Sequence, residues 1–381
     1  LGQVFCGWLC PLGTVLNALD PYVPRILPRG VAARFAEFRF WVLAFLLVVA
    51  MVGVNLSGWL DPLVILSRAV HADPRAGAIA AAVAWGTVAL ILVLVSCGTR
   101  FWCRAICPLG AILSWVSLRA PFRRRLVGTC KACGKCTEIC PSEQSWGRHA
   151  VGECFVCGRC VTACSSGALS LSFPVAAPSG ERSGGRGRVS DAGRRRWLLG
   201  GGGIGVAALV GWLTRRQSTG SFVRPPGAGS EERFVARCVG CGACVSACPT
   251  SGLVPSFSLT RLGAAFTPEL VPRVGACLPP CTACGDACFT GALPRLTAED
   301  KLLARIGLAV IDPARCLPWS AGERCVICVD ACPAEYAAIE LRRFGPGAFR
   351  PVVLATRCTG CGLCEFRCPV EGASAIRVAP V

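Results

Sequence analysis

The chain has 381 residues, of which 53% are hydrophobic, only 16% are charged and 29 are cysteines. Soluble domains carry about 25% charged residues, so this composition indicates a membrane protein, and the mean hydropathy of +0.54 agrees. The formal net charge of +18 does not indicate nucleic-acid binding, because many of the arginines flank apolar segments, where they set membrane orientation. The two histidines, His71 and His149, are far apart in sequence and no C-x-x-C-H motif occurs, which excludes a c-type haem.

Two long uncharged stretches in the first hundred residues predict transmembrane helices. Residues 40–60 and residues 76–98 contain 21 and 23 residues without a charge, and about 20 apolar residues span a bilayer as a helix. The loop between them carries two arginines, Arg68 and Arg75, whereas the two outer flanks together carry ten. The positive-inside rule therefore predicts that both flanks are cytoplasmic and that the loop is outside.

A repeated motif, C-x3-C-P-L-G, lies on the flanks predicted to be cytoplasmic. One copy contains Cys6 and Cys10, and the other contains Cys103 and Cys107. Residues four apart share one face of a helix, so the two copies could present four thiolates to one cluster or frame a quinol site at the membrane surface. Reduced structural pairs or a disulfide are the alternatives, and a stable disulfide is disfavoured in the cytoplasm. Cys97 is interpreted as a small buried apolar residue.

The remaining cysteines form six groups of four. Four groups have the spacing C-x2-C-x2-C-x3-C, which is typical of [4Fe–4S] ligands in bacterial ferredoxins. The fourth of the six groups opens with x3, and the fifth opens with an eight-residue insertion. Zinc ribbons and disulfides are the alternatives, but zinc sites favour paired C-x-x-C knuckles separated by a long loop. We therefore expect six [4Fe–4S] clusters. The groups are Cys130, Cys133, Cys136 and Cys140; Cys154, Cys157, Cys160 and Cys164; Cys238, Cys241, Cys244 and Cys248; Cys277, Cys281, Cys284 and Cys288; Cys316, Cys325, Cys328 and Cys332; and Cys358, Cys361, Cys364 and Cys368.

The groups are expected to exchange their last ligands. In a two-cluster ferredoxin the fourth cysteine of one group ligates the cluster of the other group. The later four groups could pair sequentially or in a nested order. For the first two groups the rule predicts Cys130, Cys133 and Cys136 with Cys164, and Cys154, Cys157 and Cys160 with Cys140.

A linker and a third apolar segment separate the second group from the third. Residues 174–196 are rich in Gly, Ser, Pro and Arg and predict a linker. Residues 193–213 read GRRRWLLGGGGIGVAALVGWL, the pattern of a twin-arginine export signal. Its 17 uncharged residues at 197–213 are about the lower limit for a membrane span, and no A-x-A cleavage site follows. We expect a retained anchor; an ordinary basic linker before a third span is the alternative.

These features predict a helical membrane part joined to α+β modules of the bacterial-ferredoxin type. We expect a multi-pass protein of the cytoplasmic membrane with two clusters inside and four outside. The predicted segments are a membrane domain at 1–120, a two-cluster ferredoxin domain at 121–173, a linker at 174–196, a signal anchor at 197–213 and a four-cluster ferredoxin domain at 214–381.

The sequence resembles two families that usually occur as separate proteins. Residues 1–175 resemble the NapH type of membrane quinol dehydrogenase subunit in both C-x3-C-P motifs, the spans between them and the paired ferredoxin groups. Residues 190–381 resemble the exported four-cluster ferredoxins of the NapG and MauM type in GRRRWLL, in RPPG at residues 224–227 and in the four later groups. The resemblance implies a fusion, so that a once N-terminal signal is now internal. Because the family's membrane part has two more spans before the first C-x3-C-P, we also expect upstream sequence.

The resemblance implies nested pairing in the exported module. The implied sets are Cys238, Cys241 and Cys244 with Cys368; Cys358, Cys361 and Cys364 with Cys248; Cys277, Cys281 and Cys284 with Cys332; and Cys316, Cys325 and Cys328 with Cys288.

The function implied by the resemblance is electron transfer within a respiratory complex. Electrons would pass from quinol through the clusters to an exported reductase or cytochrome, without haem and without a nucleic-acid partner. One alternative is an assembly factor that supplies reducing equivalents to a metalloenzyme. Another is a route from ferredoxin to quinone in the opposite direction. Whether the C-x3-C-P motifs hold a seventh cluster is left open.

Overall fold

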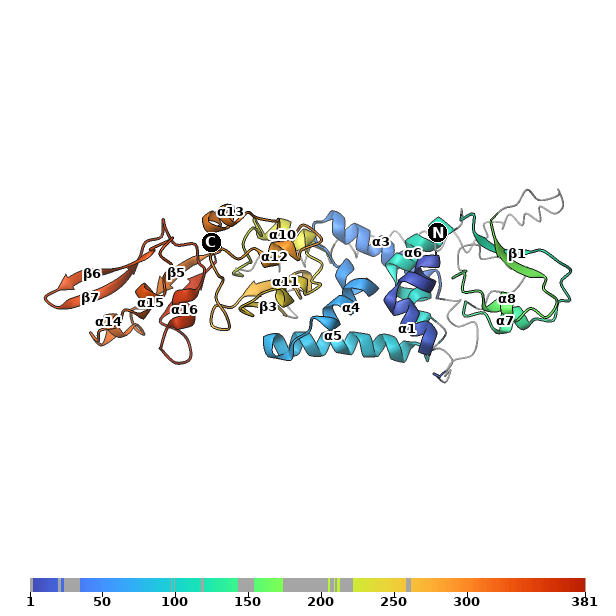
Figure 1. Ribbon diagram of the computed structural model, residues 1–381, viewed down its shortest axis with the longest axis horizontal. Coiled ribbons are helices and arrows are strands. Elements are labelled where there is room, and N and C mark those ends of the chain that lie inside the picture. The colour runs from blue at the N-terminus through green and yellow to red at the C-terminus, as the bar shows by residue number, and fades with distance from the viewer. Residues whose placement is uncertain are drawn as a thin grey trace. The chain divides into compact units, whose positions relative to one another are not determined.

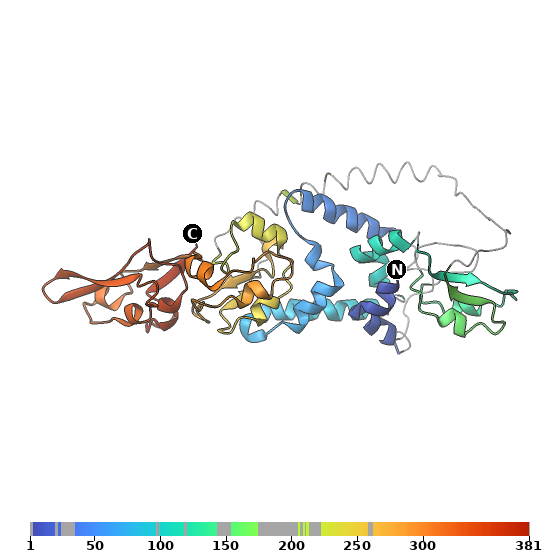
Figure 2. The same cartoon turned by 45° about the horizontal axis from the view of Figure 1, so that its top comes forward.

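The computed structural model divides into two compact units, each described here by itself (Figures 1 and 2). Unit 1 comprises Leu1–Met51, Leu56–Leu66 and Gly86–Val210, and unit 2 comprises Val52–Asn55, Ser67–Trp85 and Gly211–Val381. The predicted linker and signal anchor lie almost entirely outside the described residues. The structure describes residues 3–19, 22–23, 35–96, 98, 100–117, 120–142, 154–173, 205, 209, 211–212, 222–257 and 262–380.

The two C-x3-C-P motifs of unit 1 adopt the same local fold. In each, a π-helical turn, η1 (Phe5–Leu9) or η3 (Trp102–Ile106), leads into a helix that begins at the motif's proline, α1 (Pro11–Leu19) or α6 (Pro108–Ser117). Proline suits the first helical position because its missing N–H would be unpaired there. The motif's glycine packs against the preceding turn: a Cβ on Gly13 would lie 2.1 Å from the carbonyl oxygen of Cys6, and the second copy repeats this contact.

The first predicted span, residues 40–60, is not one continuous helix. Helix α3 (Phe38–Met51) has 14 residues, which makes it about 21 Å long, short of the roughly 30 Å hydrocarbon core. It ends where Gly53 takes a left-handed conformation, with φ of 89°, and the 3-10 turn η2 (Ser57–Trp59) follows. The positive φ favours glycine and breaks the helical path.

The second predicted span corresponds to a long helix. Helix α4 (Pro62–Val70) and helix α5 (Pro74–Leu94) follow η2. Among the described residues, Gly77–Leu94 is the one helix long and apolar enough to cross a membrane, judged by length and composition. The helix ends four residues before the predicted limit at residue 98.

The first ferredoxin domain is closed by two strands that flank its cysteine groups. Strand β1 (Arg123–Leu126) pairs antiparallel with β2 (Leu169–Ser172), with Leu126 opposite Leu169. Between the strands, each group contributes one short helix, α7 (Lys135–Glu138) or α8 (Arg159–Thr162), that carries its third cysteine. The chain therefore enters and leaves the two groups at one place.

Unit 2 repeats this pattern with short helices and two-stranded sheets. Its first half pairs β3 with β4, and its second half pairs β5 with β8 and contains the β6–β7 hairpin (Figure 1). The elements are α10 (Glu231–Arg237), α11 (Ala243–Ser246), β3 (Leu253–Pro255), η4 (Leu262–Ala264), β4 (Pro268–Leu270), α12 (Ala283–Asp286), α13 (Ala298–Leu303), β5 (Leu308–Ile311), α14 (Leu317–Ser320), α15 (Ile327–Asp330), β6 (Ile339–Gly345), β7 (Ala348–Val353), α16 (Leu363–Arg367) and β8 (Ile376–Ala379).

The two halves of unit 2 have separate small cores that include the cysteines. In the first, Phe234, Leu253 and Leu293 pack with Cys244 and Cys284. In the second, Tyr336, Ile339 and Ile376 pack with the last cysteine group. The first core is tight enough that a Cβ on Gly252 would lie 1.8 Å from the carbonyl oxygen of Gly275. This contact joins the chain after one group to the chain before the next.

Arg224, the first residue of the RPPG motif, ties the first half of unit 2 together. Its side chain is 7% exposed and donates to Glu231 Oε2 at 2.8 Å, to Thr267 Oγ1 at 2.9 Å and to the carbonyl oxygen of Pro268 at 2.7 Å. The guanidinium also lies 4.9 Å from the ring centroid of Phe234. A charge-assisted pair of this kind is strong and directional, because two parallel N–H groups of the guanidinium donate to the two carboxylate oxygens of Glu231.

Replacing Arg224 with alanine is expected to destabilise unit 2 by about 2–4 kcal/mol, because it leaves Glu231 and the Thr267 turn without their partner. We expect a fall in the midpoint of thermal unfolding, followed by circular dichroism. Arg233→Ala is the matched control, since Arg233 is exposed on the same helix, α10, that carries Glu231. Equal midpoints for the two variants would contradict a structural role for the Arg224 network.

Candidate iron–sulfur sites

The regular cysteine groups share one backbone conformation. The residue after the second cysteine is glycine with positive φ in all four: Gly134 at 75°, Gly158 at 80°, Gly242 at 84° and Gly362 at 81°. Each glycine precedes the short helix that carries the third cysteine. A second residue with positive φ lies between the first two cysteines, for example Gly240 at 63°. Tight turns of this kind can direct successive backbone N–H groups toward one point and make an anion-binding nest.

The two variant groups reach the same helix without that glycine. Thr282 and Val326 occupy the equivalent positions with φ of −114° and −125°. The longer first loops of these groups therefore replace the left-handed turn, and their third cysteines, Cys284 and Cys328, still lie on short helices.

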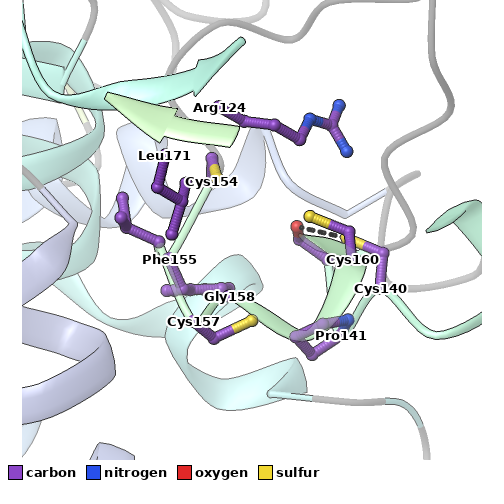
Figure 3. Close-up of a pocket in the computed structure, with 11 residues that line it drawn as sticks. Arg124, Cys140, Pro141, Cys154, Phe155, Cys157, Gly158, Cys160 and Leu171 are labelled. Carbon is purple, nitrogen blue, oxygen red and sulfur yellow. Dashed lines mark hydrogen bonds between the residues drawn. The ribbon is translucent and has the colours of Figure 1, made fainter. Parts of the chain in front are cut away.

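In the first ferredoxin domain, one predicted ligand set is gathered around a pocket. Cys154, Cys157, Cys160 and Cys140 line a cavity with an empty volume of about 400 Å³, together with Arg124 from β1 (Figure 3). Burial raises the pKa of Cys160, and the charge and hydrogen bond of Arg124 oppose the rise. The fourth cysteine of the first group thus lies with the first three of the second, and the exchange of ligands stays a prediction. Of the companion set, Cys130 and Cys133 are exposed, and Cys136 and Cys164 are partly buried.

In unit 2 the cysteines gather into four sets. Set A is assigned from packing, because Cys238, Cys244 and Cys288 share the first core. Burial raises the pKa of Cys238 and Cys244, and the neighbouring thiols of Cys241 and Cys288 add to the rise. Sets B, C and D each line one pocket. Set A is Cys238, Cys241, Cys244 and Cys288; set B is Cys277, Cys281, Cys284 and Cys248; set C is Cys358, Cys361, Cys364 and Cys332; and set D is Cys316, Cys325, Cys328 and Cys368.

This grouping is sequential and differs from the nested pairing implied by the family resemblance. Cys368 lies with Cys316, Cys325 and Cys328, rather than with the group at Cys238. The strands explain the difference. Strand β5 precedes the fifth group, and β8, which follows the sixth, pairs with it, so Leu308 lies opposite Ala379. The two groups between these strands are thereby held together, as β1 and β2 hold the first two.

The four sets are connected in one line. Sets A and B are adjacent: Cys244 and Cys284 lie in one core, and the Cys284 thiol adds to the burial that raises the pKa of Cys244. Sets B and C are joined by a backbone hydrogen bond of 2.8 Å from the N–H of Cys277 to the carbonyl oxygen of Cys361. Sets C and D are adjacent: Cys328 packs against the core that contains Cys364, and its thiol adds to the burial that raises the pKa of Cys364. The order is therefore A, B, C and D.

Burial raises the pKa of thiols in the cysteine sets of unit 2. It raises the pKa of Cys238 to about 11 and that of Cys284 to about 12, and neighbouring thiols add to the rise. Free thiols here would stay protonated, so metal binding would release protons. The donor chemistry fits an iron–sulfur cluster, which is held by four thiolates in an apolar pocket. Single-metal geometry is different: within the described residues, no three Cys, His, Asp or Glu side chains stand close enough to hold one metal ion.

Four of the six fourth cysteines have hydroxyl partners that sequence reasoning missed. Burial alone would raise the pKa of Cys288, but hydrogen bonds, first from the N–H of Leu293 and then from the Thr290 side chain, hold it below the usual value. Thr290 Oγ1 lies 3.6 Å from Cys288 Sγ. The same C-x-[S/T] spacing recurs at Cys140, Cys164 and Cys248. The Ser or Thr two residues after the cysteine is the sequence signal that could have revealed these partners. Cys332 and Cys368 lack it, because Ala334 and Val370 stand at that position.

The four C-x3-C-P cysteines are buried together in unit 1. Cys6, Cys10, Cys103 and Cys107 are each less than 9% exposed. Burial, with a smaller contribution from the neighbouring thiols of Cys107 and Cys10, raises the pKa of Cys6 to about 12. Their meeting does not come from one helical face as expected, because Cys10 ends the π-helical turn in an extended conformation. It comes from packing of the two motifs against each other. Every described cysteine is a free thiol.

Arg100 links this cysteine cluster to the first ferredoxin domain within unit 1. Its Nη1 donates to the carbonyl oxygen of Cys6 at 3.1 Å, and its guanidinium lies 4.3 Å from the ring centroid of Phe155. Trp8 Nε1 also donates to the carbonyl oxygen of Val156 at 3.2 Å. Phe155 and Val156 stand between two cysteines that line the pocket of Figure 3, so the two cysteine sites are neighbours.

Comparison with protein families identifies iron–sulfur domains in three places. A model of a 4Fe–4S dicluster domain matches residues 323–372, and a 4Fe–4S binding domain matches residues 234–253. A further 4Fe–4S binding domain matches residues 1–29 and 78–129, which include both C-x3-C-P motifs. The chain is thus an iron–sulfur protein with several [4Fe–4S] binding domains.

Curated relatives define the family. The methylamine utilization ferredoxin-type protein MauM of Paracoccus denitrificans is 40% identical over 206 residues, which are 51% of this chain and 87% of the relative. The ferredoxin-type protein NapG of Escherichia coli is 40% identical over 190 residues, 47% of this chain and 78% of the relative. NapF of Escherichia coli is 33% identical over 171 residues, 44% and 94% of the two chains. This chain belongs to the family of ferredoxin-type proteins that includes MauM and NapG. No match to a solved structure was found.

Replacing Thr290 with valine is expected to lower the reduction potential of the cluster of set A, because a hydrogen bond to the thiolate favours the more negative, reduced state. The fall should be on the order of 59 mV, the equivalent of a tenfold change for one electron. Thr250→Val is the matched control, since the hydroxyl of Thr250 also donates to the carbonyl oxygen of Ala276 at 2.8 Å and is shared. Redox titration followed by EPR measures both; a larger shift in the control would contradict the assignment.

Proposed function

We propose that this chain is an electron conduit that takes electrons from quinol at the membrane and passes them to an exported reductase or cytochrome. The observation that carries the proposal is the linear order of sets A to D in unit 2, with adjacent sets joined by neighbouring thiols or by a backbone hydrogen bond. When bound, each cluster takes up and releases one electron. The chain's own work is to hold four thiolates at each place and to keep the pockets apolar.

Sets A and B differ from sets C and D in the groups that contact the sulfur of the fourth cysteine. Cys288 of set A and Cys248 of set B have hydroxyl partners. Cys332 of set C accepts instead from the backbone N–H of Ala338 at 3.2 Å, and at Cys368 of set D the residue two positions on is valine. Hydrogen bonds to sulfur tune the potential, so the sets are not equivalent along the line.

A seventh cluster at the C-x3-C-P cysteines is part of the proposal. Four buried thiols meet there, and a buried cation stands beside them: Arg100 is 2% exposed, and its Nε and Nη2 have no hydrogen-bond partner among the described residues. A buried guanidinium is costly without negative charge nearby. Four thiolates holding iron would supply that charge, and the match of a 4Fe–4S binding model to both motifs supports this choice over a structural role.

The proposed topology places two clusters in the cytoplasm and four outside, with a fusion of NapH-like and NapG-like parts in one membrane protein. Two sets of contacts support it. Within unit 1, the C-x3-C-P turns contact the first ferredoxin domain. Within unit 2, Ser67 and Arg68, from the loop between the predicted spans, contact the group at Cys238. Each contact joins segments that charge distribution and the export signal put on one side of the membrane.

A role as an electron-donating assembly factor is the second candidate, and it predicts a different donor and acceptor. The relative MauM is named for methylamine utilization, and a role in supplying electrons to one metalloenzyme under assembly is compatible with that name. Turnover of quinol by the purified protein separates the two, because only the conduit oxidises quinol repeatedly in the presence of an artificial acceptor.

The purified protein is expected to contain about 24 iron atoms per chain, or about 28 with a cluster at the C-x3-C-P cysteines, since each cubane takes four thiolates. Iron and acid-labile sulfide analysis measures this. Zinc in place of iron would overturn the assignment. The double replacement of Cys6 and Cys103 by serine should remove about four iron atoms. Unchanged iron with lost quinol oxidation would instead favour a quinol site at these thiols.

Reporters fused after Ala168 and after Val381 are expected to lie on opposite faces of the membrane, the first inside and the second outside, because the flanking arginines favour that orientation. Replacement of Arg194 and Arg195 by lysine should retain the last four groups inside if export uses the twin-arginine route. Two reporters on the same face would show that residues 197–213 do not span the membrane.

A further inference from the structure

The loop that opens set A is covered by a cation from a distant part of the sequence. Arg68, which lies 172 positions before Gly240, donates from Nε to the carbonyl oxygen of Gly240 at 2.9 Å and from Nη2 to that of Val239 at 3.2 Å. Its guanidinium lies 3.9 Å from the ring centroid of Phe266. Arg68 is 6% exposed. All these residues belong to unit 2.

Two neighbours of Arg68 complete the cover. Ser67 Oγ donates to the carbonyl oxygen of Cys241 at 3.2 Å. A Cβ on Gly242 would lie 3.1 Å from Cβ of His71, so this glycine is in contact with His71, whose ring in turn lies 2.7 Å from the carbonyl oxygen of Ser67 through Nδ1. The last turn of α4 and His71 just after it therefore contact each residue from Val239 to Gly242 in succession.

The equivalent loop of set C has the same backbone shape and a neutral cover. Gly360 and Gly362 have φ of 76° and 81°, close to the values in set A. There the loop accepts a backbone hydrogen bond of 2.8 Å from the N–H of Ile306 to the carbonyl oxygen of Thr359. A Cβ on Gly362 would lie 2.5 Å from Cβ of Pro272. Two loops with the same fold thus differ in whether a charge covers them.

A buried charge beside one loop acts on the cluster held by that loop. Reduction adds one negative charge to a cluster, and a guanidinium in a low-dielectric site stabilises that charge more than an exposed one does. An arginine keeps its charge throughout the working pH range, because the guanidinium is not deprotonated in proteins. Burial of such a cation is costly unless its donors are directed at acceptors, and the carbonyl oxygens of Val239 and Gly240 together with the ring of Phe266 meet that need.

We propose that Arg68 is a positioning residue for set A, which holds the loop 238–242 in place and raises the reduction potential of the cluster bound there, making set A the electron-accepting end of the line. The inference rests on the proposed function only in that set A holds a cluster. It ties the C-terminal end of helix α4 to the loop of set A, so that one side chain both holds this loop and sets the charge beside it.

The test is an EPR-monitored redox titration of the full chain extracted from membranes. The signal of set A is identified as the one altered by Cys241→Ser. Arg68→Gln is expected to lower its midpoint potential by at least the equivalent of a tenfold change in the one-electron equilibrium, while the signals of sets B, C and D stay in place. Arg68→Lys, which keeps the charge, should retain most of the potential.

Arg233→Gln is the control for charge alone, since it removes an exposed cation of the same unit that solvent and salt screen. An unshifted set A signal in Arg68→Gln, or an equal shift in all four signals, would overturn the proposal. So would a fall in Arg68→Lys as large as that in Arg68→Gln. If Arg68→Gln loses the set A signal altogether, Arg68→Lys carries the test: a retained midpoint potential supports the proposal, and a fall overturns it. Absence of every iron–sulfur signal in the unmutated protein would instead refute the proposed function.

Discussion

A cluster-binding loop must direct three thiols from seven consecutive residues to one point, and most of this molecule follows from that requirement. An extended or helical backbone spreads such residues apart, so the loop must turn twice within five residues. Glycine after the second cysteine permits the left-handed turn at Gly134, Gly158, Gly242 and Gly362. The short helix after each turn brings the third cysteine back toward the first. The rest of each module exists to cover these loops and to supply a fourth thiol.

Exchange of the fourth thiol makes neighbouring groups inseparable. Cys248 stands in the first group of unit 2 and lines the pocket of the second, and Cys332 stands in the fifth group of the chain and lines the pocket of the last. Loss of either cysteine would therefore disturb a loop in another part of the sequence. The exchange also places the paired groups in one core, so that their thiols are neighbours within each half of unit 2.

The residues that pack over the cysteine loops differ from set to set. Two of the four sets in unit 2 have a hydroxyl beside the fourth sulfur. One loop is covered by the guanidinium of Arg68, and another by the backbone of Ile306 and by Pro272. In unit 1, Arg100 stands between the C-x3-C-P cysteines and Phe155 of the first ferredoxin domain. Charge and hydrogen bonding near sulfur are the means by which a protein tunes a cluster, so sets with the same ligands need not have the same potential.

The sequence by itself determined the kind of site, because the spacing of cysteines along seven to eleven residues is a local property that dictates which thiols can meet. It also indicated the exchange in the first ferredoxin domain, where Cys140 does line the pocket of Cys154, Cys157 and Cys160. The tertiary structure decided the rest. Sequential pairing in unit 2 depends on β5 meeting β8, and the end of α3 at Met51 depends on the turn at Gly53. The meeting of Arg68 with Gly240 could not be predicted, because no local pattern links residues separated by 172 positions. Such contacts are set by packing of whole elements, and hydropathy and spacing do not describe that packing.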